Sequence, residues 1–171
     1  MFELNEFVIH TTGGICRVTD IAPLDMPGAD KSRKYYFLVP LNGKGSRVFV
    51  PVDNSSAIRK VMTGEEAWKL IDEIPCIEEM QVDNDKLRES MYKEAIRSCD
   101  LRELVKVIKN LRSRRAKRLS EGKKTTATDD KYFKIAEDNL YSELAFAIGR
   151  QKNEMEQVIT ERIHSVLNSA I

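Results

Sequence analysis

The chain has 171 residues, of which 42% are hydrophobic and 32% are charged, and its formal net charge at pH 7 is +1. This composition indicates a globular protein with one domain or two small ones, and it excludes a uniformly basic nucleic-acid coat. Any binding of an anionic partner must therefore depend on cations that are sorted onto one region of the surface.

The cysteines and histidines favour neither a disulfide framework nor a metal site. Cys16, Cys76 and Cys99 are widely separated and form no C-x-x-C pair, and the only histidines are His10 and His164. We therefore expect reduced thiols, no metal and no cofactor. The N-terminal segment lacks the pattern of a signal peptide and no run of 18 apolar residues occurs, so we expect a cytoplasmic protein that has no membrane partner.

The first third of the chain has the pattern of short antiparallel strands. Phe7–His10 and Ile15–Ile21 flank a short polar turn that contains glycine. Lys34–Val39 and Arg47–Val52 follow, separated by a second turn, and both are rich in the aromatic and β-branched residues that fit a pleated sheet. Strands at this spacing predict a small antiparallel barrel. Pro51 cannot donate a ladder hydrogen bond, so the last strand should end there or lie at a sheet edge.

Beyond about residue 60 the apolar residues recur with a helical period. Thr63 and Glu66 form a capping-box pattern in front of a short helix that Pro75 ends. A more polar helix is expected over 83–98. The apolar residues that should face inward from it are Leu87, Met91, Ala95 and Ile96.

Three further helices complete the predicted helical part. Asp100 should cap the first of them, whose apolar stripe is Leu101, Leu104, Val105, Ile108 and Leu111. Thr126 or Thr128 should cap the next, which ends at Gly149, and the last should run over 152–168. The predicted fold class is thus α+β: a small antiparallel β domain over 1–60, then a compact all-helical domain of about five helices over 61–171.

No convergent polar constellation indicates an enzyme. His10 stands at the end of a strand with no serine or cysteine nucleophile assigned to it, and the glycine-bearing turn lacks the pattern of a phosphate-binding loop. The acidic segment Ile77–Asp85 lacks the ligand spacing and central glycine of a calcium loop. We therefore predict a protein that is not an enzyme.

The clearest charge feature is a basic stretch between Lys109 and Lys124, in which Glu121 is the single acid. Its cations lie near the end of one predicted helix and next to the start of another, whose free amides could also meet a phosphate. Cations near a helix C-terminus also stabilise the helix dipole by a few tenths of a kcal/mol each. Phosphate binding and a merely solvated helical face therefore both stay open.

Several segments, taken together, resemble the CarD/CdnL-like bacterial transcription regulators. They run in order from about Phe7 to Gly149 and read FVIHTTGGICRVTDI, YYFLV, VFVPV followed by AIRKV, SCDLRELVKVIKNLRSRR and AEDNLYSELAFA. The resemblance implies a Tudor-like RNA-polymerase-interacting domain followed by a helical domain that contacts promoter DNA. Such proteins bind the polymerase β subunit through the barrel and influence open-complex stability at the upstream fork of the transcription bubble.

The resemblance and the residue pattern together suggest the two binding surfaces. An exposed barrel strand can extend a sheet of the partner, and the expected polymerase contacts are Arg47, Val48, Phe49 and Val50. In the alternative interpretation Val48 and Val50 are core residues, whereas Arg47 and Phe49 are incidental surface. The expected DNA contacts, mostly to phosphates and without strong sequence specificity, are Lys86, Arg88, Arg112, Arg114, Arg115, Lys117, Arg118, Lys123, Lys124 and Lys131.

The chain also departs from the family pattern. Many members carry a tryptophan that wedges against the minor groove, and the matching position here falls at about Asp85, whereas the single tryptophan, Trp68, lies earlier. The family's glycine before Asp100 is Cys99. A polymerase-binding adaptor without DNA contact therefore stays open, and so does an RNA-binding Tudor-like module. We expect a monomer, although exchange of edge strands in a domain-swapped dimer is a further alternative.

Overall fold

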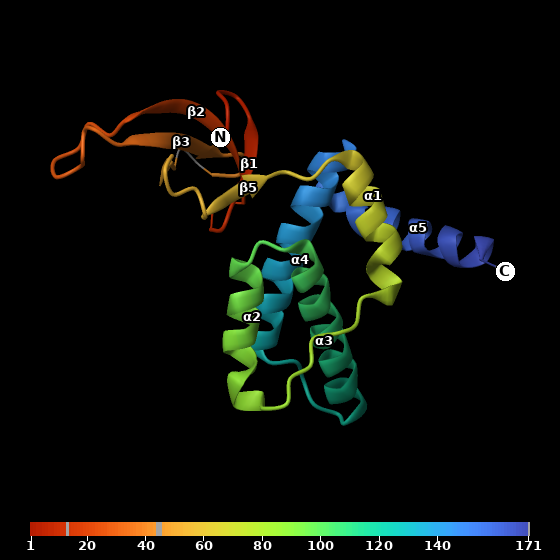
Figure 1. Ribbon diagram of the computed structural model, residues 1–171. Helices are drawn as coiled ribbons and strands as arrows, with labels where there is room; N and C mark the ends of the chain where they lie inside the picture. Colours follow the sequence, from red (N-terminus) through yellow and green to blue (C-terminus); the bar gives the residue numbers. More distant parts are fainter. Residues whose placement is uncertain (13, 44–45, 171) are drawn as a thin grey trace. The chain divides into compact units, whose positions relative to one another are not determined.

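The computed structural model of the protein describes residues 1–12, 14–43 and 46–170 (Figure 1). Contacts between Cα atoms divide it into two compact units, Met1–Val61 and Met62–Ile171. The first unit holds a five-stranded antiparallel sheet that is curled, and the second holds five α-helices within the described residues. The predicted α+β class, with a Tudor-like β part followed by a helical part, is therefore confirmed.

The sheet has the strand order β4-β3-β2-β1-β5. Its strands are β1 (Phe7–His10), β2 (Gly14–Pro23), β3 (Lys34–Pro40), β4 (Val48–Pro51) and β5 (Ile58–Lys60). The sequence did not reveal β5, because three residues are too few for an alternating pattern to be recognised. Gly13 of the first predicted turn, and Lys44 and Gly45 of the second, lie outside the described residues.

One face of the sheet carries the core of the first unit. It consists of side chains that are at most 8% exposed: Val8, Cys16, Val18, Tyr36, Leu38, Val50 and Ile58. Burial raises the pKa of the Cys16 thiol to about 11, so it stays protonated at neutral pH. Among the described residues, Cys16, Cys76 and Cys99 form no disulfide.

The helices are α1 (Gly64–Glu73), α2 (Arg88–Arg97), α3 (Leu101–Ser120), α4 (Ala127–Ile148) and α5 (Met155–Ser169), with short 3₁₀ turns at Ile74–Cys76, Asp85–Leu87 and Lys152–Glu154. No helix in the described part of the chain is long and apolar enough to cross a membrane. The capping box of Thr63 and Glu66 is present, and Thr126 rather than Thr128 caps α4. Gly149 ends α4 with a left-handed φ of 67°, as expected.

The core of the second unit is built on α3. All five residues of its predicted stripe are buried. The prediction for α2 was partly wrong, since Asn84 caps a 3₁₀ turn, the α-helix begins only at Arg88, and Leu87 is 55% exposed. Tyr92, which the pattern missed, is the fully buried residue of α2, and its ring centroid lies 5.8 Å from that of Tyr132 on α4.

The fifth helix has a short buried face. Met155 is its one fully buried residue, whereas Leu167 is 52% exposed. Val158 and Ile159 are partly buried against the core of the unit. The burial of α5 is therefore deepest at its N-terminal end.

Cys99 joins α2 to α3 with a φ of 55°. A side chain in this left-handed region clashes with its own backbone, whereas glycine adopts it without that cost. This conformation gives a physical reason for the glycine that the resembling family carries here.

We predict that Cys99→Gly is more stable than Cys99→Ala by about 1 kcal/mol, because both variants remove the sulfur but only glycine relieves the left-handed strain. Urea unfolding followed by the fluorescence of Trp68, which lies in the same unit, measures the difference. Equal stability of the two variants would contradict the strain argument.

Candidate functional site

The predicted polymerase-contact strand is β4, at one end of the sheet order. Its side chains alternate: Val48 is half-buried and Val50 is only 3% exposed, whereas Phe49 is 37% exposed and Arg47, just before the strand, is exposed. Val50 belongs to the core, so it can offer a partner its backbone but not its side chain. Arg47 and Phe49 are the residues whose side chains are accessible.

The backbone N–H and C=O groups of β4 point alternately toward β3 and away from it. Tyr36 lies opposite Val50, and the Val52 amide donates a hydrogen bond to the Lys34 carbonyl at 3.0 Å. In an antiparallel ladder this register turns the polar groups of residues 48, 50 and 52 toward β3. The N–H and C=O groups of Phe49 therefore face away from the sheet. Pro51, which has no N–H, occupies the next outward position, where its missing donor breaks no hydrogen bond to β3.

Aromatic side chains lie next to this edge on the face opposite the core. The rings of Phe37 and Phe49 meet edge to face, with centroids 5.0 Å apart. The guanidinium of Arg33 lies 6.0 Å from the ring centroid of Tyr35 and its Nε is 2.8 Å from Asp53 Oδ1. An added strand at β4 would thus meet outward backbone groups beside a half-exposed aromatic pair.

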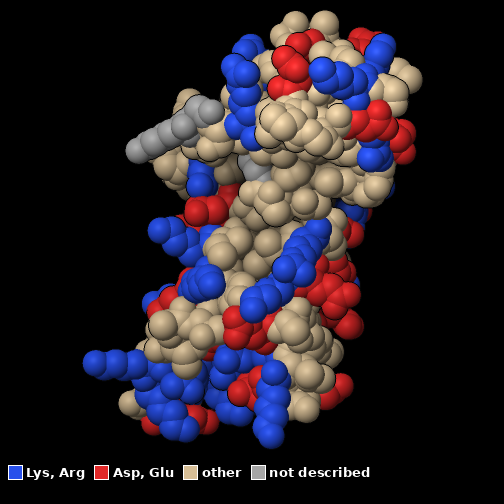
Figure 2. Space-filling view, turned by 90° about the vertical axis from the view of Figure 1, so that its left-hand side faces the viewer, with Lys and Arg blue, Asp and Glu red and all other residues tan. Residues whose placement is uncertain are grey.

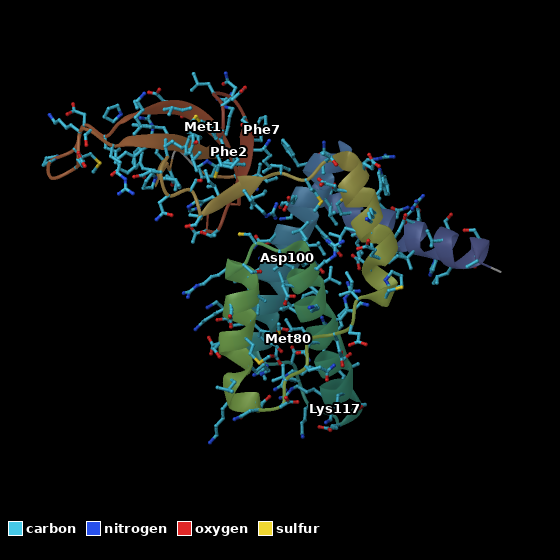
Figure 3. All side chains as sticks on the ribbon, in the orientation of Figure 1. Met1, Phe2, Phe7, Met80, Asp100 and Lys117 are labelled. Carbon is cyan, nitrogen blue, oxygen red and sulfur yellow. The ribbon has the colours of Figure 1, made fainter. Side chains whose placement is uncertain are left out.

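The predicted DNA contacts gather at one end of the helical unit, where the start of α2, the end of α3 and the start of α4 come together (Figure 1). Figure 3 shows Lys117 at this end of α3 and Asp100 at the other. Lysine and arginine side chains cluster on the surface of this end in Figure 2. We call this region the basic end; it comprises residues 85–88, 112–118, 123–124 and 127–131.

Two of the predicted contacts are tied to aspartates. Arg88 pairs with the carboxylate of Asp129, and these two side chains are 12% and 9% exposed. Arg114 donates through Nε to Asp129 Oδ2 at 2.8 Å and through Nη1 to Asp85 Oδ1 at 2.9 Å. Asp85 also approaches Arg88, with its Oδ1 3.4 Å from Arg88 Nε. This four-residue ion cluster joins α2, α3 and α4.

Further cations of the basic end have contacts within the protein. Arg118 donates to the Lys124 carbonyl at 2.8 Å, and Lys123 pairs with Glu121 at 2.9 Å. Arg112 lies 3.9 Å from Glu137 and 5.8 Å from the ring centroid of Phe133.

A second set of cations is exposed and has no carboxylate within 4 Å among the described residues. This uncommitted set consists of Lys86, Arg115, Lys117, Lys124 and Lys131. Lys131 lies beside an aromatic side chain, with its Nζ 5.4 Å from the ring centroid of Tyr132. The structure therefore divides the ten predicted DNA contacts into cations with partners inside the protein and cations that have no carboxylate within 4 Å among the described residues.

A hollow of about 210 Å³ opens beside the ion cluster. It is lined by Val82, Asp85, Arg88, Asn110, Ser113, Arg114 and Lys117. Asn110, one of the lining residues, is held by two hydrogen bonds: its side chain accepts from the Tyr92 hydroxyl at 2.6 Å and donates to the Met80 carbonyl at 3.0 Å. Sequence reasoning missed the hollow, since its lining comes from segments about 30 residues apart.

His10 and Trp68, the other residues singled out in the sequence, have contacts within their own units. The His10 ring accepts from the Thr12 amide at 3.3 Å, and burial lowers the pKa of His10. Within the described residues no three His, Cys, Asp or Glu side chains are grouped to hold a metal ion. Trp68 lies on α1 under the guanidinium of Arg162, 5.6 Å from the ring centroid, and Arg162 pairs with Asp72.

We predict that Asp129→Ala lowers the free energy of unfolding of the helical unit by about 3 kcal/mol or more, because it leaves two arginines without their shared, buried carboxylate. Asp130→Ala, in the same turn but exposed, should cost less than about 1 kcal/mol. Urea unfolding followed by Trp68 fluorescence compares them, and similar losses for both variants would be contrary to this assignment.

Comparison with known proteins agrees with the arrangement of two units. The family model described as the CarD-like/TRCF RID domain matches residues 2–62, and the model described as the CarD C-terminal domain matches residues 69–160. A search of curated proteins found no match. The two family domains occur here in order and cover most of the chain, the second alone covering more than half of it. The chain therefore belongs to the CarD family, whose members are non-enzymatic transcription factors that interact with RNA polymerase.

Proposed function

We propose that this protein binds the RNA polymerase β subunit through the β4 edge and contacts promoter DNA near the upstream fork through the basic end, thereby modulating open-complex stability. The observation that carries the proposal is the outer edge of β4, with which no other strand of the described residues pairs, in a domain that matches the polymerase-interacting family model. In this proposal the first unit docks on the polymerase and the helical unit supplies the DNA contacts.

The geometry of β4 supports strand addition. Phe49 offers an outward N–H and C=O, so a partner strand could form a pair of backbone hydrogen bonds there. Pro51 offers only a carbonyl, which limits the length of the added ladder. The Phe37 and Phe49 rings, packed edge to face, would add apolar contact area beside these bonds. Arg47 adds a charge at the start of the strand, which favours an acidic partner segment.

The uncommitted set supports phosphate contacts. Its five cations belong to three helix ends that meet, although the whole chain has a net charge of only +1. Exposed lysines and arginines without carboxylate partners attract the nucleic-acid backbone and release its counterions, which requires no base recognition. The N-termini of α2 and α4 reach the same end and add the positive ends of their dipoles.

The adaptor alternative also has an observation in its favour. Arg88 and Arg114, two of the expected DNA contacts, already hold Asp85 and Asp129. An RNA-binding module is less well supported, because Tyr36 is 1% exposed and Tyr35 is half-buried beside Arg33. Tyr35 and Tyr36 therefore do not offer two stacking platforms to successive bases.

For the polymerase contact, we predict that Arg47→Glu and Phe49→Ala each weaken binding to the isolated β subunit by about tenfold, as expected for contacts at an interface centre. The matched control is Arg17→Glu, an exposed charge reversal on β2, two strands away from the edge. Affinities are measured by surface plasmon resonance. An equal loss for the control would place the contact elsewhere on the sheet.

For the DNA contact, we predict that the double variant Arg115→Gln, Lys124→Gln lowers the slope of log Kd against log salt by about two for a forked duplex, because two phosphate contacts are lost. The matched control is Arg97→Gln, an exposed arginine at the opposite end of α2. Fluorescence anisotropy across a salt series gives the slopes. Absence of any salt-dependent binding by the unaltered protein would leave only the adaptor function.

A further inference from the structure

The hollow at the basic end already contains a carboxylate. Asp85 Oδ1 lies 2.9 Å from Arg114 Nη1 and 3.4 Å from Arg88 Nε, and Lys117 lines the same hollow. The Asp85 side chain is 70% exposed, whereas that of Asp129, on the other side of the two arginines, is 9% exposed. One carboxylate of the ion cluster is therefore part of the protein interior, and the other lies at the surface.

The net charge of the ion cluster also divides between its buried part and the exposed Asp85. Arg88, Arg114 and the buried Asp129 together carry one net positive charge, which the Asp85 carboxylate balances. A phosphodiester also carries a single negative charge and presents two oxygens to a guanidinium. It would therefore match the charge and the geometry of the group that it replaced.

The local structure allows such an exchange. Asp85 begins a three-residue 3₁₀ turn, and its ion pairs are those of an exposed side chain, which are weak in water. Asp129 is held from both sides in the first turn of α4, so the two arginine side chains stay in place when Asp85 moves away. Lys117, with no carboxylate within 4 Å among the described residues, would then add a third cation beside Arg88 and Arg114 for the incoming phosphate.

We infer that the hollow formed by Arg88, Ser113, Arg114 and Lys117 is a binding site for one phosphate group of a nucleic-acid backbone, and that the Asp85 carboxylate occupies it in the free protein as a built-in competitor. This inference rests on the proposed DNA contact and adds its regulation: DNA must displace Asp85 to reach Arg114. The carboxylate weakens DNA binding by the helical unit alone, and polymerase docking supplies the local concentration that overcomes it.

The test replaces Asp85 by the isosteric, neutral asparagine. Asp85→Asn should bind a forked duplex about three- to tenfold more tightly at low salt, with a salt slope steeper by about one, because one phosphate contact no longer competes with a carboxylate. Asp83→Asn is the matched control, since Asp83 is an exposed acid two residues earlier with no ion pair within 4 Å in the described structure. Equal gains for both variants would overturn the inference in favour of a general charge effect.

A second readout needs no DNA. Inorganic phosphate, titrated into ¹⁵N-labelled protein, should shift the Arg114 Nε–H resonance at lower concentration in Asp85→Asn than in the unaltered protein or in Asp83→Asn. Asp85→Ser repeats the experiment if the first variant is less stable. A phosphate response without DNA binding would support the site and reject the proposed DNA contact. A different result would reject the phosphate site but leave the proposed DNA contact standing. In that result, DNA binding depends on Arg115 and Lys124, but replacing Asp85 changes neither the DNA affinity nor the phosphate response.

Discussion

The buried carboxylate of Asp129 is the contact on which the basic end of the helical unit depends. It lies in the first turn of α4 and receives Arg88 from α2 and Arg114 from α3, so a single side chain joins three helices. Guanidinium groups that are largely withdrawn from water are costly unless they are paired, and the shared carboxylate of Asp129 offsets much of that cost for Arg88 and Arg114. Because these helix ends are held together, the exposed lysines and arginines around them are held at one end of the unit.

This arrangement separates cations that look equivalent in the sequence. Arg114 and Arg115 are neighbours, yet Arg114 is bound to two aspartates, whereas Arg115 points to solvent. Asp85, which the family resemblance places at about the position of a tryptophan in many members, faces the same arginines from the solvent side. Under the proposed function, a carboxylate in place of that apolar wedge would oppose DNA, and we propose that this chain depends more on polymerase docking than on its own affinity for the fork.

The β4 edge imposes a comparable constraint on the first unit. Successive side chains of β4 point to opposite faces of the sheet, so Val48 and Val50 lie on the core side. Phe49 is the residue of β4 whose side chain and backbone are both accessible. An edge with free backbone groups risks uncontrolled association. Pro51 limits the number of backbone hydrogen bonds that an added strand could form, and it does so without disturbing the pairs with β3. Under the proposed function, the edge is therefore open to a partner strand but cannot support a long added ladder.

The sequence by itself determined the class of the fold, the helix caps and the apolar stripe of α3, because these depend on neighbours within a few residues along the chain. Pro51 indicated that its strand either ends there or lies at an edge, and segments in a recognisable order indicated the family. Tertiary structure alone decided the burial of Tyr92, the late start of α2 and which cations are engaged, since Asp85, Arg114 and Asp129 meet only after three helices have packed. A local sequence pattern identifies the chemical type of a side chain. Whether its charge is neutralised by an ion pair depends on partners that are distant in sequence.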